Sequence, residues 1–222
     1  MSNNMSLEDL HKKFHEHLEN QSKNWKSLIY AKEKGFYQGY DALKIDGWRP
    51  SEKRFVSYGI ESYLSMEKTA LDIGSNCGFF TLHVSNFLKN IHGVEINPFL
   101  ISIGNDAKNF LKVENTFFHN SSFEDFKIDK KFNVIFSLAN DSTIDQNTQF
   151  NFYEYVEKIV KLLDFSGILI FECQAADMIP ISKFTPKFEH LKKYFKILEE
   201  KRVPSEYPVN VPERILLVLE KL

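Results

Sequence analysis

Long apolar runs, cysteine clusters and an excess of one charge are all missing from this 222-residue sequence. No apolar run approaches the roughly 18 residues of a membrane-spanning helix, and the polar N-terminus lacks the apolar core of a signal peptide. The two cysteines, Cys77 and Cys173, lie far apart and form neither a metal-binding pattern nor a disulfide framework. These absences predict a cytoplasmic protein of a reducing compartment, with no membrane partner.

The charge balance argues against nucleic acid as the main partner. Lys and Arg number 28, Asp and Glu number 30, and the formal net charge is −2. Proteins that hold nucleic acid chiefly through its phosphates are usually strongly basic, because each contacted phosphate exchanges counterions for a protein cation. With 43% hydrophobic and 14% aromatic residues, the chain has the composition of a folded protein with a sizeable core. We expect a small-molecule substrate and leave the oligomeric state open.

Short apolar segments alternate with helical patterns from residue 69 onward. The predicted strands cover residues 69–73, 91–96, 115–121, 132–139, 167–174, 195–203 and 213–221. This alternation predicts an α/β fold with a parallel sheet and right-handed crossovers. No helical pattern separates the last two strands, so we expect them to form a hairpin. Ligands of such a sheet bind beyond the carboxyl ends of its strands.

The first 68 residues have a different pattern. Apolar residues at helical spacing predict an amphipathic helix and then a second short helix within residues 6–34. Residues 35–50 are rich in glycine and large aromatics, which predicts a loop that docks on another part of the protein. A helical pattern resumes over residues 51–64, with Ser51 as the expected N-cap. We therefore divide the chain into an N-terminal helical extension, 1–68, and a domain, 69–222.

A glycine turn follows the first predicted strand of the domain. The segment LDIGSNCGFF places Gly74, Ser75, Asn76 and Gly78 between a strand and a helix, where glycine lets the backbone approach a ligand. A dinucleotide-binding fingerprint would have glycine where Asn76 stands, to make room for pyrophosphate. A side chain at that position favours a ligand without pyrophosphate.

Acidic residues precede and follow this turn. Asp72 lies in the strand before it, and Glu95 ends the second strand, where a carboxylate can accept hydrogen bonds from both hydroxyls of a ribose. Together with the turn, they predict a nucleoside-binding site. The alternative is a glycine turn in an α/β domain that binds no ligand.

The motifs LDIGSNCGFF and GVEINP resemble those of class I S-adenosylmethionine-dependent methyltransferases, over about residues 69–220. The resemblance implies a Rossmann-like, doubly wound seven-stranded sheet, mostly parallel with an antiparallel last strand, and S-adenosyl-L-methionine as the cofactor. It further implies that Asp72, Gly74 and Gly78 surround the methionine moiety, that Glu95 binds the ribose and that Ile96 contacts the adenine. The predicted cofactor site also includes Ser75, Asn76, Ser122 and Phe123. Ser122 stands where these enzymes often have an acid that binds the adenine amino group.

A second resemblance concerns the segment GWRPSEKR at residues 47–54. It is similar to a G-Q-R-P-T motif that precedes the glycine turn in a subset of these enzymes, several of them linked to small-molecule or surface-polysaccharide modification. Trp48 and Ser51 depart from that form. The resemblance implies methyl transfer to oxygen or nitrogen of a small polar acceptor, such as a sugar or a phosphorylated metabolite.

Two acids are candidate catalytic bases. The methyl group of the cofactor is already activated, so the protein must hold the acceptor in line, and a hydroxyl acceptor also benefits from a base. We predict Asp141, after the fourth strand, as that base, the alternative being a solvated loop acid or a helix cap. Glu172, late in the fifth strand, needs a partner because it is predicted to be buried. That partner is the substrate or a nearby backbone amide.

Substrate-binding residues are predicted from the extension and from the end of the fourth strand; they are Tyr37, Tyr40, Arg49, Arg54 and Asn140. The arginines can grip a phosphate or a carboxylate with two hydrogen bonds each. The tyrosines can close over the site as a lid, or pack the extension onto the sheet. Both interpretations of the tyrosines stay open.

No metal is expected. His83, His92 and His119 fall within predicted helices and strands, which favours structural roles, and His11 and His15 lie on a polar helix with no third ligand in sequence.

Three other functions remain as alternatives to a small-molecule methyltransferase. The first is a tRNA or RNA methyltransferase, against which the charge balance argues. The second is a catalytically silent subunit that binds S-adenosylmethionine. The third and weakest is an NAD-dependent dehydrogenase, which the substituted glycine turn disfavours.

Overall fold

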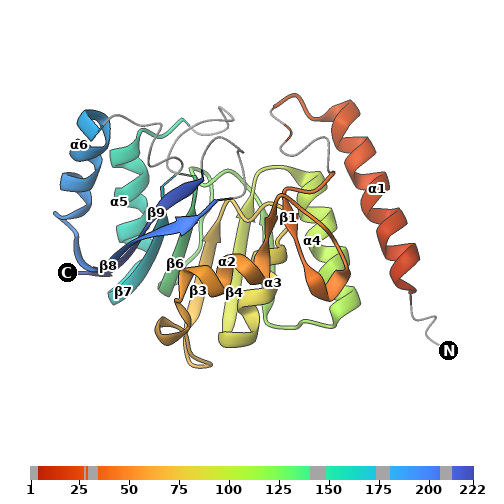
Figure 1. The fold of residues 1–222 in the computed structure, drawn as a ribbon, viewed down its shortest axis with the longest axis horizontal. Coiled ribbons are helices and arrows are strands. Elements are labelled where there is room, and N and C mark those ends of the chain that lie inside the picture. Colours follow the sequence, from red (N-terminus) through yellow and green to blue (C-terminus); the bar gives the residue numbers. More distant parts are fainter. Residues whose placement is uncertain (1–4, 28, 30–34, 141–148, 174–180, 206–211) are drawn as a thin grey trace.

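The central strands of this fold are apolar and buried on both faces, whereas an edge strand over residues 195–204 alternates buried or half-buried residues with exposed ones. The computed structural model describes residues 5–27, 29, 35–140, 149–173, 181–205 and 212–222. Its main strands are β3 (Thr69–Ile73), β4 (Asn90–Glu95), β5 (Thr116–Asn120), β6 (Phe132–Leu138), β7 (Leu163–Glu172), β8 (Phe195–Pro204) and β9 (Glu213–Lys221). Among the described residues they form one seven-stranded sheet in the order β5-β4-β3-β6-β7-β9-β8 (Figure 1). Strand β9 runs antiparallel to both of its neighbours, and the other pairs are parallel. The predicted Rossmann-like topology and the pairing of the last two strands are confirmed.

Helices cover both faces of the sheet, as the doubly wound prediction requires. The helices are α1 (Leu7–Asn24), α2 (Ser51–Tyr58), α3 (Phe79–Val84), α4 (Pro98–Leu111), α5 (Phe152–Leu162) and α6 (Ile181–Leu191). Short 3₁₀ turns span Asp41–Leu43, Glu61–Tyr63 and Ser85–Phe87. One core joins α5 and α6 to one face of the sheet, and a second joins α2 and α3 to the opposite face. No helix within the described ranges is both long and apolar enough to cross a membrane.

Some predicted boundaries are wrong by a few residues. Ser51 is the first residue of α2 rather than its cap; Pro50 occupies the cap position, and the Ser51 hydroxyl donates to the carbonyl of Gly39 instead. Helix α6 begins at Ile181 and contains Pro186, whereas the helical pattern FEHLKKYF in the sequence predicts a helix only over residues 188–195. Most of residues 25–34, where a second helix was predicted, lie outside the described ranges, as does Asp141. In contrast, Asn97 caps α4 as its Asn-Pro start indicates.

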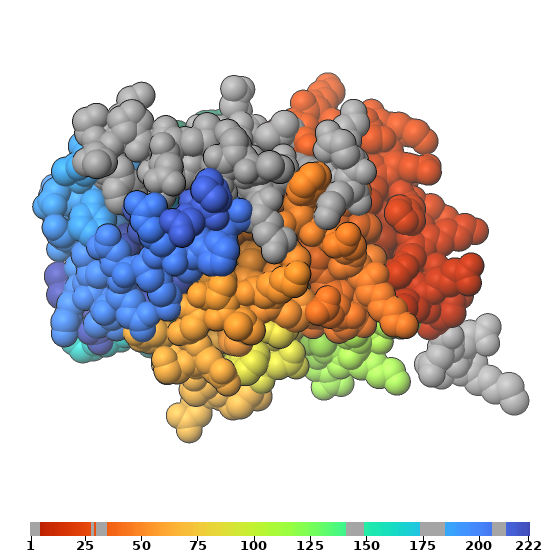
Figure 2. Space-filling model, viewed as in Figure 1, coloured from red at the N-terminus to blue at the C-terminus, as the bar shows by residue number. Residues whose placement is uncertain are grey.

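The N-terminal extension shares a core with the domain. Leu10 and Phe14 of α1 are fully buried against residues of the 36–45 segment, α3 and α4. Asp106 of α4 pairs with Lys13 at 2.9 Å and with His17 at 3.0 Å. Helix α1 lies at one end of the molecule, away from β8 and β9, whereas α2 lies over the middle of the sheet (Figures 1 and 2).

A two-stranded parallel sheet follows α1, made of β1 (Gln38–Gly39) and β2 (Arg49–Pro50). The segment just before β2 approaches β1 closely: a Cβ added to Gly47 would lie 2.3 Å from the backbone nitrogen of Gly39. The glycine-rich segment that the sequence predicts as a docking loop therefore contains a tightly packed strand pair.

Candidate functional site

The glycine turn between β3 and α3 is held in a conformation that demands glycine. Gly74, Asn76 and Gly78 have positive φ angles of 66°, 54° and 72°. Gly74 and Gly78 adopt this conformation without the strain that a Cβ would add, and asparagine tolerates it better than most other residues. A Cβ at Gly78 would lie 2.3 Å from Cζ of Phe118, and one at Gly74 would lie 3.2 Å from the side-chain amide of Asn140. Both predicted glycines are therefore required by the local backbone or by its neighbours.

Glu95 fastens the middle of this turn. Its carboxylate accepts a hydrogen bond from the backbone N–H of Asn76 at 3.0 Å and another from that of Asn97 at 2.9 Å. Because β3 and β4 are adjacent and parallel, their carboxyl ends lie at the same edge of the sheet. The structure therefore brings together the turn and the acid that the sequence predicts as a nucleoside site.

Asp72 lies beneath the turn, on β3. It is buried, and it accepts a hydrogen bond from the Thr81 hydroxyl of α3 at 2.6 Å. Burial raises the pKa of Asp72 to about 6, although the Thr81 hydrogen bond and the nearby Arg54 guanidinium act in the opposite direction.

Gln38 is a residue of this site that sequence reasoning missed. Its Nε2 donates to the carbonyl oxygen of Ser75 at 3.1 Å, and its Oε1 accepts from the backbone N–H of Phe79 at 2.9 Å. The second bond satisfies an N–H of the first turn of α3, which has no partner inside the helix. A glutamine between aromatic residues carries no motif, so only its place in the fold identifies it.

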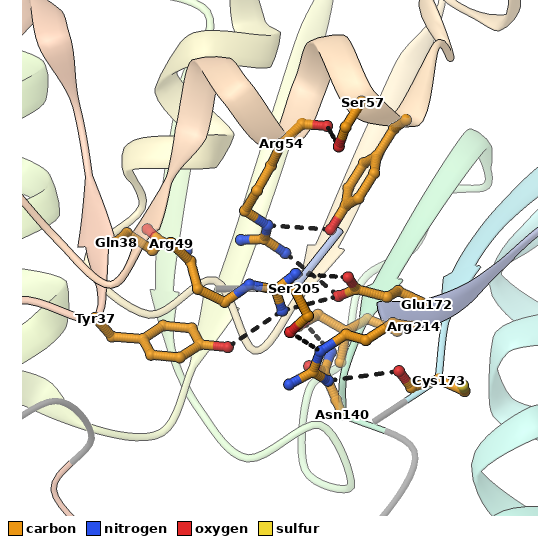
Figure 3. Close-up of polar contacts among 12 residues, drawn as sticks. Tyr37, Gln38, Arg49, Arg54, Ser57, Asn140, Glu172, Cys173, Ser205 and Arg214 are labelled. Carbon is orange, nitrogen blue, oxygen red and sulfur yellow. Dashed lines mark hydrogen bonds and ion pairs between the residues drawn. The ribbon is translucent and has the colours of Figure 1, made fainter. Parts of the chain in front are cut away.

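A buried ion pair lies at the carboxyl end of β7 (Figure 3). Arg49 holds Glu172 with two parallel bonds: Nη1 to Oε2 at 3.1 Å, and Nη2 to Oε1 at 2.6 Å. Their side chains are 1% and 0% exposed. Arg54 approaches the same carboxylate at 3.6 Å and donates through Nε to the Tyr58 hydroxyl at 3.0 Å.

Two further residues of the cluster come from other segments. Tyr37 accepts a hydrogen bond from Arg49 Nη1 at 3.4 Å. Arg214 of β9 donates through Nε to the Ser205 hydroxyl at 2.9 Å and through Nη1 to the Cys173 carbonyl at 3.4 Å (Figure 3). Neither Arg214 nor Ser205 carries a sequence signal, because the antiparallel pairing of β8 and β9 is what brings them to this edge.

The electrostatics of the cluster favour an ionised Glu172. Burial opposes ionisation, but the guanidinium groups of Arg49 and Arg54 overcome it and hold the pKa of Glu172 at about 2. Burial also opposes ionisation of Tyr37, whose pKa nevertheless lies below its ordinary value because of Arg49, Arg54 and Arg214. The sequence left substrate and backbone amide open as the partner of Glu172; the structure gives a third partner, Arg49. A carboxylate with so low a pKa is a weak proton acceptor.

The other predicted site residues have mixed environments. Tyr40 is buried against Phe79 and His83, so it packs the extension onto the domain. Asn140 donates through Nδ2 to the carbonyl of Ile73, directly below the glycine turn.

The predicted adenine-contacting residues follow β4 and β5. Ile96 is half-buried, and its carbonyl accepts from the Asn120 side chain at 2.8 Å. Ser122 donates to Asp125 at 2.8 Å, and Phe123 is buried against Tyr155.

Histidines take structural positions. His92 and His119 stack on neighbouring strands with Nδ1 and Nε2 2.7 Å apart, and Lys130 contacts His92. Burial, assisted by Lys130, lowers the pKa of His92 to about 4, so it is neutral near pH 7. His11 hydrogen-bonds the Leu43 carbonyl at 2.8 Å. Within the described ranges, no group of three or more His, Cys, Asp or Glu side chains is arranged to hold a metal.

Comparison with known proteins is informative about the family and the fold. A family model described as a methyltransferase domain matches residues 64–206. No curated protein matches the chain. The N-methyltransferase NodS of Bradyrhizobium japonicum, in complex with S-adenosyl-L-homocysteine, has a TM-score of 0.63 at 13% identity, covering 96% of this chain and 98% of that one.

Two other solved structures share the fold. A putative class I S-adenosylmethionine-dependent methyltransferase of Listeria monocytogenes has a TM-score of 0.62 at 17% identity and covers 99% of this chain and 69% of that one. An rRNA methylase of Streptococcus thermophilus has a TM-score of 0.55 at 18% identity, covering 77% of this chain and 96% of that one. One of these proteins is named an N-methyltransferase, another an rRNA methylase, and the third name gives no acceptor, so the shared fold does not select an acceptor.

Proposed function

The chain belongs to the methyltransferase-domain family, and from that premise we propose that it transfers a methyl group from S-adenosyl-L-methionine to oxygen or nitrogen of a small polar acceptor. The observation that carries the proposal is the turn from Gly74 to Gly78, with Glu95 fastened to its middle. It lies at the carboxyl edge of a mostly parallel sheet, where such folds bind ligands.

The residues of the turn fit the cofactor. Gly74 is exposed, so its backbone is open to the methionine moiety, whereas Gly78 is buried against Phe118 and sets the shape of the turn. Asp72, ionised above its pKa of about 6, supplies negative charge near the ammonium group of that moiety. A carboxylate has about four acceptor positions, so Glu95 can bind ribose hydroxyls as well as the two backbone amides. When bound, the cofactor supplies a methyl group already activated by a sulfonium.

The adenine is assigned to the residues that follow the next two strands. Ile96 directly follows β4, and Ser122 and Phe123 follow β5, so all three lie at the same edge as Glu95. Ile96 supplies apolar contact, and the Ser122 hydroxyl supplies the polar one.

The acceptor is assigned to the guanidinium cluster beside the turn. Tyr37, Arg49, Arg54 and Arg214 converge there (Figure 3), and Asn140 lies against the turn through its hydrogen bond to the Ile73 carbonyl. Three guanidinium groups favour an acceptor that carries a phosphate or a carboxylate. Glu172 is ionised and orients Arg49, so we assign it a positioning role. Asp141 remains the proposed base for the acceptor's proton.

Calorimetric titration with S-adenosyl-L-homocysteine and, separately, with NADH tests the cofactor. We expect the first to bind and the second not to bind. The Glu95→Ala variant, which removes the proposed ribose contact, is expected to weaken binding of S-adenosyl-L-homocysteine at least tenfold. Binding of NADH alone, or of neither ligand, would overturn the proposal.

Transfer of a labelled methyl group tests the acceptor. The wild-type protein and Asp141→Asn are incubated with labelled cofactor and with sugars, phosphorylated metabolites or tRNA. We expect label in a phosphorylated or carboxylated small molecule, and slower turnover in Asp141→Asn. Label found in tRNA would contradict the small-molecule acceptor, and release to no acceptor at all would favour a silent subunit. Unchanged turnover of Asp141→Asn would remove that residue as the base.

A further inference from the structure

The small β1–β2 sheet connects the two halves of the site. Gln38 of β1 lies directly opposite Arg49 of β2 in the parallel register. The Gln38 side chain reaches the glycine turn, and the Arg49 side chain reaches Glu172 at the end of β7. Two neighbouring residues of one small sheet therefore contact the turn that follows β3 and the end of β7.

The Gln38 amide spans the turn in a way that few side chains can. The Ser75 carbonyl needs a donor and the Phe79 N–H needs an acceptor, and the amide supplies both groups from one plane. Gln38 is 4% exposed, so water does not replace these bonds at little cost. The two contacted residues bracket Asn76, Cys77 and Gly78, which form the centre of the turn.

The backbone behind Gln38 is firmly held. The Ser51 hydroxyl donates to the Gly39 carbonyl at 2.8 Å, and the Arg49 N–H donates to the Tyr37 carbonyl at 2.8 Å. The close approach of Gly39 and Gly47 leaves no space for the strands to shift. Since Arg49 is anchored on buried Glu172, the position of Gln38 is set by the sheet's other half.

We propose that Gln38 is a positioning residue for methyl transfer: its side-chain amide fixes the glycine turn in the shape that receives the cofactor, and the β1–β2 sheet holds that amide in place. The inference rests on the proposed function, because it takes the turn to be the cofactor site. Without the amide, the turn populates other conformations, and the apparent affinity falls with the fraction that remains competent to bind.

The test uses Gln38→Met, which keeps the length of the side chain and removes both hydrogen bonds. Gln21→Met is the matched control, because Gln21 is also a buried glutamine of the extension, 3% exposed, and its Oε1 has no hydrogen-bond partner in the described part of the chain. Titration with S-adenosyl-L-homocysteine is carried out at a temperature where circular dichroism shows all variants fully folded. We expect the Kd to rise about tenfold for Gln38→Met and to stay within about twofold of wild type for Gln21→Met.

Two further measurements separate positioning from a general structural role. Gln38→Glu keeps an acceptor for Phe79 and, when ionised, loses the donor to Ser75, so its Kd is expected to lie between those of wild type and Gln38→Met. Hydrogen exchange of the Phe79 amide is expected to speed up at least tenfold in Gln38→Met and to be unchanged in Gln21→Met.

The outcomes are distinguishable. If wild-type protein does not bind S-adenosyl-L-homocysteine, the proposed function fails, and the inference that rests on it fails too. If wild type binds and Gln38→Met binds equally well while melting at a lower temperature, Gln38 is merely structural and only the inference fails. An equal loss of affinity in Gln21→Met would also overturn it, because the effect would then follow from loosening of the extension.

Discussion

Two glutamates end parallel strands at the same edge of the sheet, yet their surroundings differ completely. Glu95, the last residue of β4, is half-buried and accepts from the backbone amides of Asn76 and Asn97. Glu172, at the end of β7, is fully buried and is held by Arg49 and Arg54 from the N-terminal extension. The first carboxylate organises a turn that is local in sequence. The second joins segments that are distant in sequence, and that difference controls both their energetics and their predictability.

Among the variants considered, Glu172→Gln is expected to lose the most unfolding free energy. The variant leaves Arg49 buried without its counter-charge, and breaking a buried pair in this way costs about 3–5 kcal/mol of unfolding free energy. Urea denaturation at pH 7 measures the loss.

Glu199→Gln is the control, since Glu199 pairs with Lys201 at the surface and its loss is expected to cost about 1 kcal/mol or less. The double variant Arg49→Gln/Glu172→Gln is expected to lose less unfolding free energy than the sum of the losses in the two single variants, because the two side chains interact. Equal losses in Glu172→Gln and Glu199→Gln would contradict a special role for the buried pair.

The glycine turn with Glu95, here called the loop side of the site, could be predicted because its sequence signals are local. Gly74, Gly78 and Glu95 follow from strand ends and turn chemistry within a short stretch, and the structure brings them together. The antiparallel last strand follows from the lack of a helical sequence pattern between residues 203 and 213. The arginine cluster around Glu172, here called the far side of the site, could not be predicted, because nothing near Glu172 in sequence indicates Arg49. The two partners considered for Glu172, a substrate and a backbone amide, did not include Arg49.

The same reasoning explains which contacts of the extension the sequence left open or did not predict. Tyr40 and His11 carry no sequence signal for burial or for a backbone partner, because their contacts come from α3 and from residue 43. Gln38 was missed for the same reason, since its two partners, Ser75 and Phe79, lie more than 35 residues further along the chain. Long-range polar contacts are specific to the fold, whereas turn glycines and helix caps are specific to the local chain.

Gly78→Ala is the variant of the loop side that is expected to lose the most stability. The added Cβ would lie 2.3 Å from Phe118 and would sit on a backbone with φ of 72°. We expect a loss of roughly 2–4 kcal/mol from overpacking and left-handed strain together. Urea denaturation measures it, and Gly78→Ala/Phe118→Leu is expected to recover the part that comes from overpacking. Full stability of Gly78→Ala would show that the turn is not constrained as described.

The pH dependence of Asp72 tests whether the two sides are electrostatically linked. Its pKa is raised from an ordinary 3.8 to about 6, so the fold favours the neutral acid, and stability from this group is lost as pH rises from about 4 to 6. Asparagine at position 72 does not titrate, so the unfolding free energy of Asp72→Asn should rise relative to that of wild type by about 2–3 kcal/mol across this pH window. Arg54→Gln, which removes a cation of the far side, should raise the pKa of Asp72 further. A constant difference between wild type and Asp72→Asn from pH 4 to 7 would contradict the shift.

Glu95→Gln sharpens the comparison most directly, because it makes on the loop side the same change as Glu172→Gln on the far side. A glutamine oxygen can still accept from the Asn76 or Asn97 amide, and the half-buried site lets water reach the other, so the loss is expected to be about 1 kcal/mol. Parallel urea titrations of the two variants measure the contrast. A loss as large as that of Glu172→Gln would mean that local amide bonds stabilise the fold as strongly as the buried ion pair. A small loss of stability together with weakened binding of S-adenosyl-L-homocysteine would instead place the importance of Glu95 in the ligand rather than in the fold.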